Sequence, residues 1–287
     1  MSYLISGIQQ LGVGVPDVAA AWSWYRRAFG MDVPVFGEEA EAPLMARYTG
    51  GRVQSRNAVL ALNLAGGAGF EIWQYTSRTP SGPGRAPRLG DTGIFAGVMK
   101  SRNVRAAHGH LTGLGAAPSP LVAGPDGVER FFVTDPTGNL FQVVPSESWF
   151  TEPAVIGGGA GAIIGTTDVE RALPLYRDVL GYDRVIYDER GEFADFHAVN
   201  GGDASVRRLL LGHGHRTGPF SELMGPSTLE LVQLERGRGE RIFADRFWGD
   251  LGFIHLCFDV RGMDSLAAAC AEVGHAFTVD SSKTFDM

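Results

Sequence analysis

The sequence is poor in cysteine and has no long apolar run. Cys257 and Cys270 are the only two cysteines among 287 residues, and their separation fits neither a CxxC pair nor the disulfide framework of a small secreted domain. We therefore predict reduced, structural thiols. The chain starts MSYLISGIQQ without a basic leader, and no segment approaches the ~20 apolar residues that span a bilayer. We expect a cytoplasmic protein without a membrane partner.

Positive charge is also scarce. Lys and Arg number 25 against 32 Asp and Glu, which gives a formal net charge of −7. Because affinity for nucleic acid depends on clustered cations, this balance predicts that nucleic acid is not a partner. Hydrophobic residues make up 44% of the chain, enough for the core of one large domain or two ordinary ones. The 40 glycines are spread along the chain, a pattern typical of short strands joined by tight turns.

The chain contains an internal repeat with an offset of 151 residues. Asp-Val, Ala, Tyr-Arg, Gly and Asp recur at the same spacing, starting at Asp17 and again at Asp168. Each copy follows an apolar segment, residues 11–15 or 162–166, and reads as a strand, an Asp N-cap, an amphipathic helix and a closing Gly. Pro174 lies too far into the second helix for a first-turn proline, which predicts a kink.

A weaker repeat links the segments that start at Gly93 and Gly252. Each combines a short strand with an alanine-rich helix, so the chain has four strand-helix starts, near residues 8, 93, 161 and 252. They form two halves, 1–150 and 151–287, each a pair of units, with a boundary around residues 146–161. The glycine run 157–159 fits a linker there.

Alternating segments between the predicted helices indicate strands. They cover residues 58–64, 70–75, 131–134, 140–144, 208–211 and 229–234. The run Asp-Pro-Thr-Gly-Asn at 135–139 is a turn by composition and joins two of them into a hairpin. One helix followed by several antiparallel strands, repeated, predicts the α+β class.

These features together resemble the vicinal oxygen chelate superfamily, which includes glyoxalases, bleomycin resistance proteins and extradiol dioxygenases. The resemblance rests on the strand, Asp-Val, the helix ending Tyr-Arg-x-x-x-Gly, the following strands with a Glu on the last, and the hairpin at 135–139. It covers almost the whole chain and implies four βαβββ units forming curved mixed sheets around a cup. The fourth unit departs from the pattern, because only residues 277–287 follow its helix, and we expect it to be truncated.

The resemblance also implies a metal site built from two paired units, each giving a residue on its first strand and a Glu on its last. The first-strand ligand stands seven residues before the helix cap. Counting back gives four positions: Gln10, Ala96, Gly161 and His255. The last strands of the first three units offer Glu71, Gln142 and Glu230. Neither half of the chain contains a good set alone.

Pairing the first unit with the fourth brings together Gln10, Glu71 and His255, which resembles three of the four ligands of glyoxalase I enzymes. Nitrogen and oxygen ligands with open positions suit a divalent ion, Zn, Ni, Fe or Mn. The resemblance then gives Glu71 a catalytic role in proton transfer.

Simpler interpretations stand beside this one. Gln10 can bond a neighbouring strand, and His255, on an apolar strand, can be a core histidine bonded to a carbonyl. A buried Glu230 is costly unless paired, and the sequence offers Arg207 or Arg208 as a partner across the sheet. The histidines at 108, 110, 213 and 215 favour turns and helices over metal sites. The aromatic residues at 22, 24 and 25, and the segment 247–253 before His255, favour packing.

Three functions remain open at this stage. The first is a divalent-metal-dependent lyase, isomerase or oxygenase that acts on a small oxygenated substrate. The second is a metal-free binding protein of the bleomycin-resistance type, which Ala96, Gln142 and Gly161 at ligand positions favour. The third is an extradiol dioxygenase, which Gly161 disfavours because the family has a histidine there. A small-molecule ligand and a homodimer are common to these interpretations.

Overall fold

The computed structural model describes residues 3–281. The first unit comprises β1 (Leu4–Gly14), α1 (Val18–Phe29), β2 (Val33–Glu41), the 3-10 helix η1 (Pro43–Tyr48), β3 (Ser55–Leu62) and β4 (Gly69–Tyr75). The second comprises β5 (Gly93–Ser101), α2 (Val104–Gly113), β6 (Val122–Ala123), β7 (Glu129–Thr134) and β8 (Leu140–Pro145).

The third unit is longer and the fourth is short. The third comprises β9 (Gly159–Gly165), α3 (Val169–Leu173), η2 (Pro174–Val179), β10 (Arg184–Gly191), η3 (Ala194–Phe196), β11 (Val206–Gly212), α4 (Ser221–Met224) and β12 (Thr228–Leu234). The fourth comprises β13 (Gly252–Arg261) and α5 (Met263–Glu272). Residues 273–281 form no further strand, and residues 282–287 lie outside the described part of the chain.

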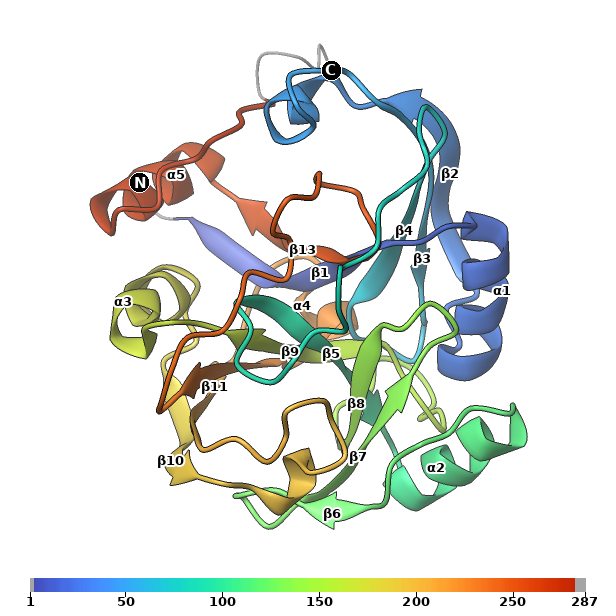
Figure 1. The fold of residues 1–287 in the computed structure, drawn as a ribbon, viewed down its shortest axis with the longest axis vertical. Helices are drawn as coiled ribbons and strands as arrows, with labels where there is room; N and C mark the ends of the chain where they lie inside the picture. Colours follow the sequence, from blue (N-terminus) through green and yellow to red (C-terminus); the bar gives the residue numbers. More distant parts are fainter. Residues whose placement is uncertain (1–2, 282–287) are drawn as a thin grey trace.

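The strands form two sheets, each of which takes strands from both halves of the chain (Figure 1). The first sheet has the order β13-β1-β4-β3-β2, and the second has the order β10-β11-β12-β9-β5-β8-β7-β6. Strand β1 pairs antiparallel with β13, and β5 pairs antiparallel with β9. The predicted pairing of the first unit with the fourth is therefore confirmed, and so is the α+β class. The boundary near residue 150 remains a prediction about the sequence repeat.

The helix signals in the sequence are confirmed. The Asp17 carboxylate accepts a hydrogen bond from the backbone N–H of Ala20, and Asp168 accepts one from Arg171. Gly30 closes α1 at φ 63°, a left-handed conformation that an L side chain rarely adopts. The α-helical stretch α3 stops at Leu173, and Pro174 starts η2, a π-helical turn. The proline thus marks a change from α-helical to π-helical hydrogen bonding within the third unit's helix, while the predicted kink stays a prediction.

The predicted turn at 135–139 joins β7 to β8 and is built around one carboxylate. Asp135 Oδ1 accepts the backbone N–H groups of Thr137 and Asn139, each at 2.8 Å. Its other oxygen accepts the buried Tyr25 hydroxyl of α1. Burial raises the pKa of Tyr25 well above its ordinary value, and the Asp135 charge raises it further. The first helix is thus tied to the second unit's hairpin.

One core lies between the two sheets. Leu11, Phe70, Phe141 and Leu231 are at most 1% exposed and belong to one apolar cluster, with members from three units. Phe253 of the fourth unit joins them, with its ring 5.3 Å from that of Phe141. Within residues 3–281, no helix is long and apolar enough to cross a membrane.

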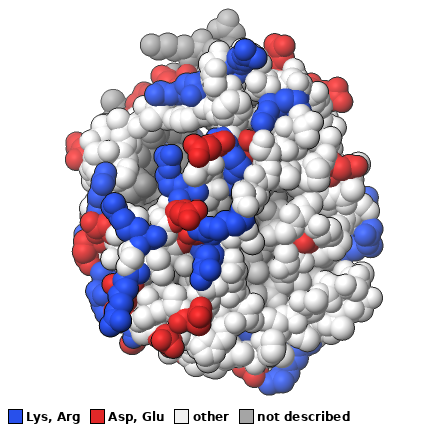
Figure 2. Space-filling view, in the orientation of Figure 1, with Lys and Arg blue, Asp and Glu red and all other residues white. Residues whose placement is uncertain are grey.

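Two long loops connect the two sheets and contact each other. Residues 76–92 follow β4 and residues 235–251 precede β13, and they lie side by side near the centre of Figure 1. Thr92 and Arg241 form an isolated bridge. Arg85 bonds Asp91 at 2.7 Å and lies 3.2 Å from Glu240. Figure 2 shows cationic and anionic side chains interspersed over the left and central part of this face, while the right part is largely uncharged.

Candidate functional site

Strand register places three polar residues on one face of the first sheet. Gly12 of β1 lies opposite Glu71 of β4 on one side and opposite His255 of β13 on the other. Gln10 stands two residues before Gly12 and therefore points to the same face, because side chains alternate along a strand. Phe70, next to Glu71, packs with its ring 4.9 Å from that of Tyr25 on α1. The three polar residues therefore lie on the face away from α1.

The side chains of Gln10, Glu71 and His255 meet at one oxygen atom. Gln10 Nε2 donates to Glu71 Oε2 at 2.7 Å, and His255 Nε2 lies 3.2 Å from the same oxygen. Gln10 is 6% exposed, and the Glu71 and His255 side chains are 14% and 24% exposed. The structure thus brings together the three residues that the sequence singled out, whereas their metal ligation and catalysis remain predictions.

Gly12 makes the space that the His255 ring occupies. A Cβ atom added to Gly12 would lie 2.4 Å from His255 Cε1 and 2.8 Å from its Nε2. This requirement was missed in the sequence, although Gly12 shares the face of Gln10 by simple alternation. The approach of His255 to Glu71 therefore requires that the residue between them, Gly12, has no side chain.

We expect Gly12→Ala to displace the His255 ring and to lower stability by about 1–3 kcal/mol, because it overpacks a filled site. Any affinity for a divalent ion should fall by about 10–100-fold, which is the usual effect of losing a residue that orients a metal-binding side chain. Urea unfolding and metal titration measure the two effects. Gly109→Ala is the control, since Gly109 lies on α2 with nothing within 4 Å of an added Cβ. It should raise stability by up to about 1 kcal/mol.

Aromatic rings cover this site. The Trp248 ring lies parallel to the His255 imidazole, with centroids 5.7 Å apart and an interplanar angle of 8°. Trp73, two residues after Glu71, meets Trp248 edge to face at 4.6 Å. The Tyr75 hydroxyl donates to the Trp248 carbonyl. The segment before β13 does pack, as predicted, but it packs on the site itself and makes Trp248 one wall of it.

Cys257 adds a protonated thiol beside the three residues. It lies opposite Gln10 in the β1–β13 register and donates to Gln9 Oε1 at 3.4 Å. Burial raises the pKa of Cys257 to about 11, with help from the nearby charges of Glu71 and Asp259. At neutral pH and without a bound metal ion, this thiol is therefore protonated and a poor nucleophile.

The residues present fit a divalent ion. Gln10 Oε1 and His255 Nδ1 are buried and have no hydrogen-bond partner. With its amide group turned by about 180°, Gln10 would direct its oxygen toward the meeting point of the three side chains and to a bound ion. One nitrogen and two oxygen donors are acceptable to Zn, Ni, Fe or Mn, and three protein ligands leave positions for substrate. Within residues 3–281, no group of three or more His, Cys, Asp or Glu side chains gathers in a metal-binding arrangement.

The corresponding face of the second sheet is filled. Ala96, Val98, Ile163 and Val232 belong to an apolar cluster that also includes Phe196. Gln142 is 2% exposed, and its Nε2 has no partner. The ligand positions of the second and third units therefore lie in a buried, largely apolar interior.

Glu230 is held by an arginine, as the sequence suggested. Arg208 Nε donates to Glu230 Oε1 at 2.6 Å, and Arg208 Nη1 donates to Asp195 Oδ1 at 2.6 Å. The Tyr187 hydroxyl donates to Glu230 at 2.7 Å. Arg207, the alternative partner, points to the other face and bonds Asp188. Glu230 is thus part of a buried structural network.

Three of the four other histidines that the sequence singled out bond protein atoms, and the fourth, His215, lies at an exposed position after β11. His108 and His110 contact the carbonyls of Ser119 and Arg27, and His213 Nε2 accepts the Ser227 backbone N–H at 3.1 Å. These contacts agree with the structural interpretation of these histidines.

Comparison with known proteins agrees with the fold. Residues 7–143 match the model of the Glyoxalase/Bleomycin resistance protein/Dioxygenase superfamily. Glyoxalase I from Zea mays is 13% identical, with a TM-score of 0.53 over 95% of this chain and 81% of that one. A putative dioxygenase from Bacillus subtilis is 14% identical, with a TM-score of 0.50 over 83% of this chain and 66% of that one. No curated protein sequence matches the chain.

Proposed function

We propose, from the premise that this chain belongs to the vicinal oxygen chelate superfamily, that it is a divalent-metal-dependent lyase, isomerase or oxygenase. Its substrate would be a small oxygenated molecule bound on the first sheet. The observation that carries this proposal is the meeting of Gln10 and His255 at one oxygen of Glu71. A homodimer remains a prediction.

Gln10, Glu71 and His255 would hold the ion, which when bound supplies Lewis-acid chemistry to neighbouring substrate oxygens. Glu71 is the carboxylate of the set and would move a proton to or from the substrate. Trp248 and Trp73 would exclude water and position the substrate, because the Trp248 ring stacks on His255 and the Trp73 ring packs against Trp248.

Metal removal tests this function. The wild-type protein is assayed with 2-oxoaldehydes, as their thiol adducts, and with catechols, before and after chelator treatment and after addition of Zn, Ni, Fe(II) or Mn. We expect turnover that chelation removes and at least one ion restores. Absence of turnover with every ion and both substrate classes would contradict the enzyme proposal.

A second candidate is a metal-free binding protein of the bleomycin-resistance type. Two observations favour it: Gln10 Nε2 and His255 Nε2 already contact Glu71 Oε2 without an ion, and Trp248 stacks directly on His255. Under this proposal the chelator leaves ligand binding and thermal stability unchanged. The extradiol dioxygenase alternative has less support, because Gly161 has no side chain and Thr228 O would lie 1.8 Å from an added Cβ.

A further inference from the structure

A hollow of about 350 Å³ lies where the two long loops meet the start of β5 and the start of β13, and it is separate from the three residues of the proposed metal site. Its walls come from five separate parts of the chain. They are residues 83–87 of the first long loop, the start of β5, the turn at 134–140, residues 198–200, and residues 242–253. The volume is within the range of small-molecule sites. None of Gln10, Glu71 or His255 lines it.

The lining is apolar apart from a few hydroxyl and amide groups and one charge. The apolar walls are Pro83, Pro87, Ile94, Phe95, Leu140, Val199, Ile242, Leu251 and Phe253. Arg246 is the only charged residue that lines the hollow, which contains no Asp or Glu. In a chain with a net charge of −7, this hollow combines apolar surface with a single cation.

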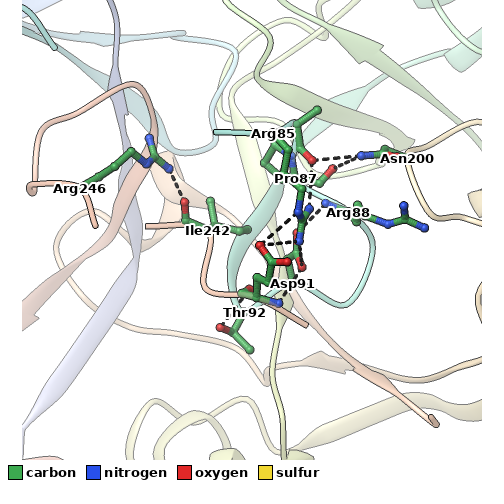
Figure 3. Close-up of polar contacts among 10 residues, drawn as sticks. Arg85, Pro87, Arg88, Asp91, Thr92, Asn200, Ile242 and Arg246 are labelled. Atoms are coloured by element: carbon green, nitrogen blue, oxygen red, sulfur yellow. Dashed lines mark hydrogen bonds and ion pairs between the residues drawn. The ribbon is translucent and has the colours of Figure 1, made fainter. Parts of the chain in front are cut away.

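The charge of Arg246 is not balanced by a carboxylate. Its Nη1 donates to the Leu251 carbonyl at 2.6 Å, its Nη2 donates to the Ile242 carbonyl, and its Nε is buried without a partner. Figure 3 shows Arg246 bonded to Ile242, apart from the cluster around Asp91. Burial lowers the pKa of Arg246, although Asp250 offsets part of that effect. A half-buried guanidinium that no carboxylate bonds directly favours a ligand of the opposite charge.

Neighbouring arginines differ in this respect. Arg85 bonds both oxygens of Asp91 and lies near Glu240, as Figure 3 shows for Asp91. Arg78 pairs with Asp250. Asp250 also accepts the backbone N–H groups of Ser81 and Phe247, so it is committed to the loop contacts. Arg246 therefore differs from Arg78 and Arg85, because no carboxylate within residues 3–281 bonds its guanidinium.

We propose that this hollow binds a small organic carboxylate, with the carboxylate at Arg246 and an apolar body against Ile94, Leu140 and Phe253. A guanidinium recognises a carboxylate strongly because hydrogen bonds and charge act together. One arginine without a second cation matches one negative charge, and the apolar walls match a ring or short hydrocarbon chain. This site goes beyond the proposed function and does not depend on it.

The test uses benzoate and its neutral analogue benzamide as probes, each titrated into the wild-type protein by calorimetry. We expect benzoate to bind with a Kd of about 1 mM or tighter, which for a ligand of this size is an ordinary efficiency. Benzamide should bind at least tenfold more weakly. Arg246→Gln should remove this preference, whereas Arg88→Gln, at an arginine outside the lining, should keep it.

A second variant fills the hollow without disturbing the core. Ala198 lines the hollow at an exposed position, so Ala198→Trp should block both probes while the protein keeps its unfolding transition. Equal affinity for benzoate and benzamide in the wild type would overturn the proposal. So would an absence of benzoate binding at 10-fold the expected Kd, or unchanged binding in both Arg246→Gln and Ala198→Trp.

Discussion

Replacing Arg208 with alanine should destabilise the protein by about 3–5 kcal/mol, the usual cost of breaking a buried ion pair from one side. Arg208 is fully buried, and its partners Glu230 and Asp195 have side chains only 2% exposed. Burial alone would lower the pKa of Arg208, but Glu230 and the hydroxyl of Tyr187 outweigh it, and the net pKa is raised. The variant would leave two buried carboxylates without their cation.

Urea unfolding measures this loss, and Arg207→Ala is the matched control. Arg207 lies next to Arg208 but bonds Glu170 and Asp188, whose side chains are 70% and 38% exposed. Its replacement should cost about 1 kcal/mol or less. Replacing Arg208, Glu230 and Asp195 together with Met, Leu and Ala should recover much of the stability. Equal losses in the two single variants would show that the network has no structural role.

Glu71→Gln should lower turnover by about 10²–10⁴-fold, the range expected when a group that transfers a proton is removed. The amide keeps the shape of the carboxylate and can still bond Gln10, so the fold should survive. Metal content measured on the same sample separates loss of the ion from loss of the proton acceptor. Glu39→Gln, at an exposed position on β2, is the control and should stay within about twofold of the wild type.

Turnover by Glu71→Gln within threefold of the wild type would remove Glu71 from the mechanism. The metal-free alternative predicts no turnover in either protein, but it still predicts weaker ligand binding if Glu71 faces the ligand. Turnover by the wild-type protein therefore distinguishes the enzyme from the metal-free binding protein. Turnover by Glu71→Gln then tests the role of Glu71.

The sequence predicted the parts of the fold that rest on local chemistry. Asp17 and Asp168 cap helices, and Asp135 builds a turn, because each acts on backbone groups a few residues away. The strands with clear apolar alternation were also found. Strands β2 and β10 were missed, since their residues are largely exposed and carry no alternating pattern.

The sequence predicted which residues form the candidate site, but it did not predict which residues surround them. The ligand positions that the family resemblance implies selected Gln10 and His255, and β13 indeed lies beside β1. The loop that carries Trp248 and Arg246 has no periodic pattern, and its course depends on distant contacts such as Arg78 with Asp250. The role of Gly12 was missed because it comes from the space that the His255 ring needs, which the sequence does not show.

Metal content tests the central claim most directly. Wild-type protein and His255→Ala are purified without chelator, and divalent ions are counted per chain by elemental analysis. Our account predicts close to one ion per wild-type chain and a loss of most of it in His255→Ala, with an unchanged unfolding transition showing that the variant folds. A wild-type protein that holds no ion, even after incubation with Zn, Ni, Fe(II) or Mn, would contradict the account.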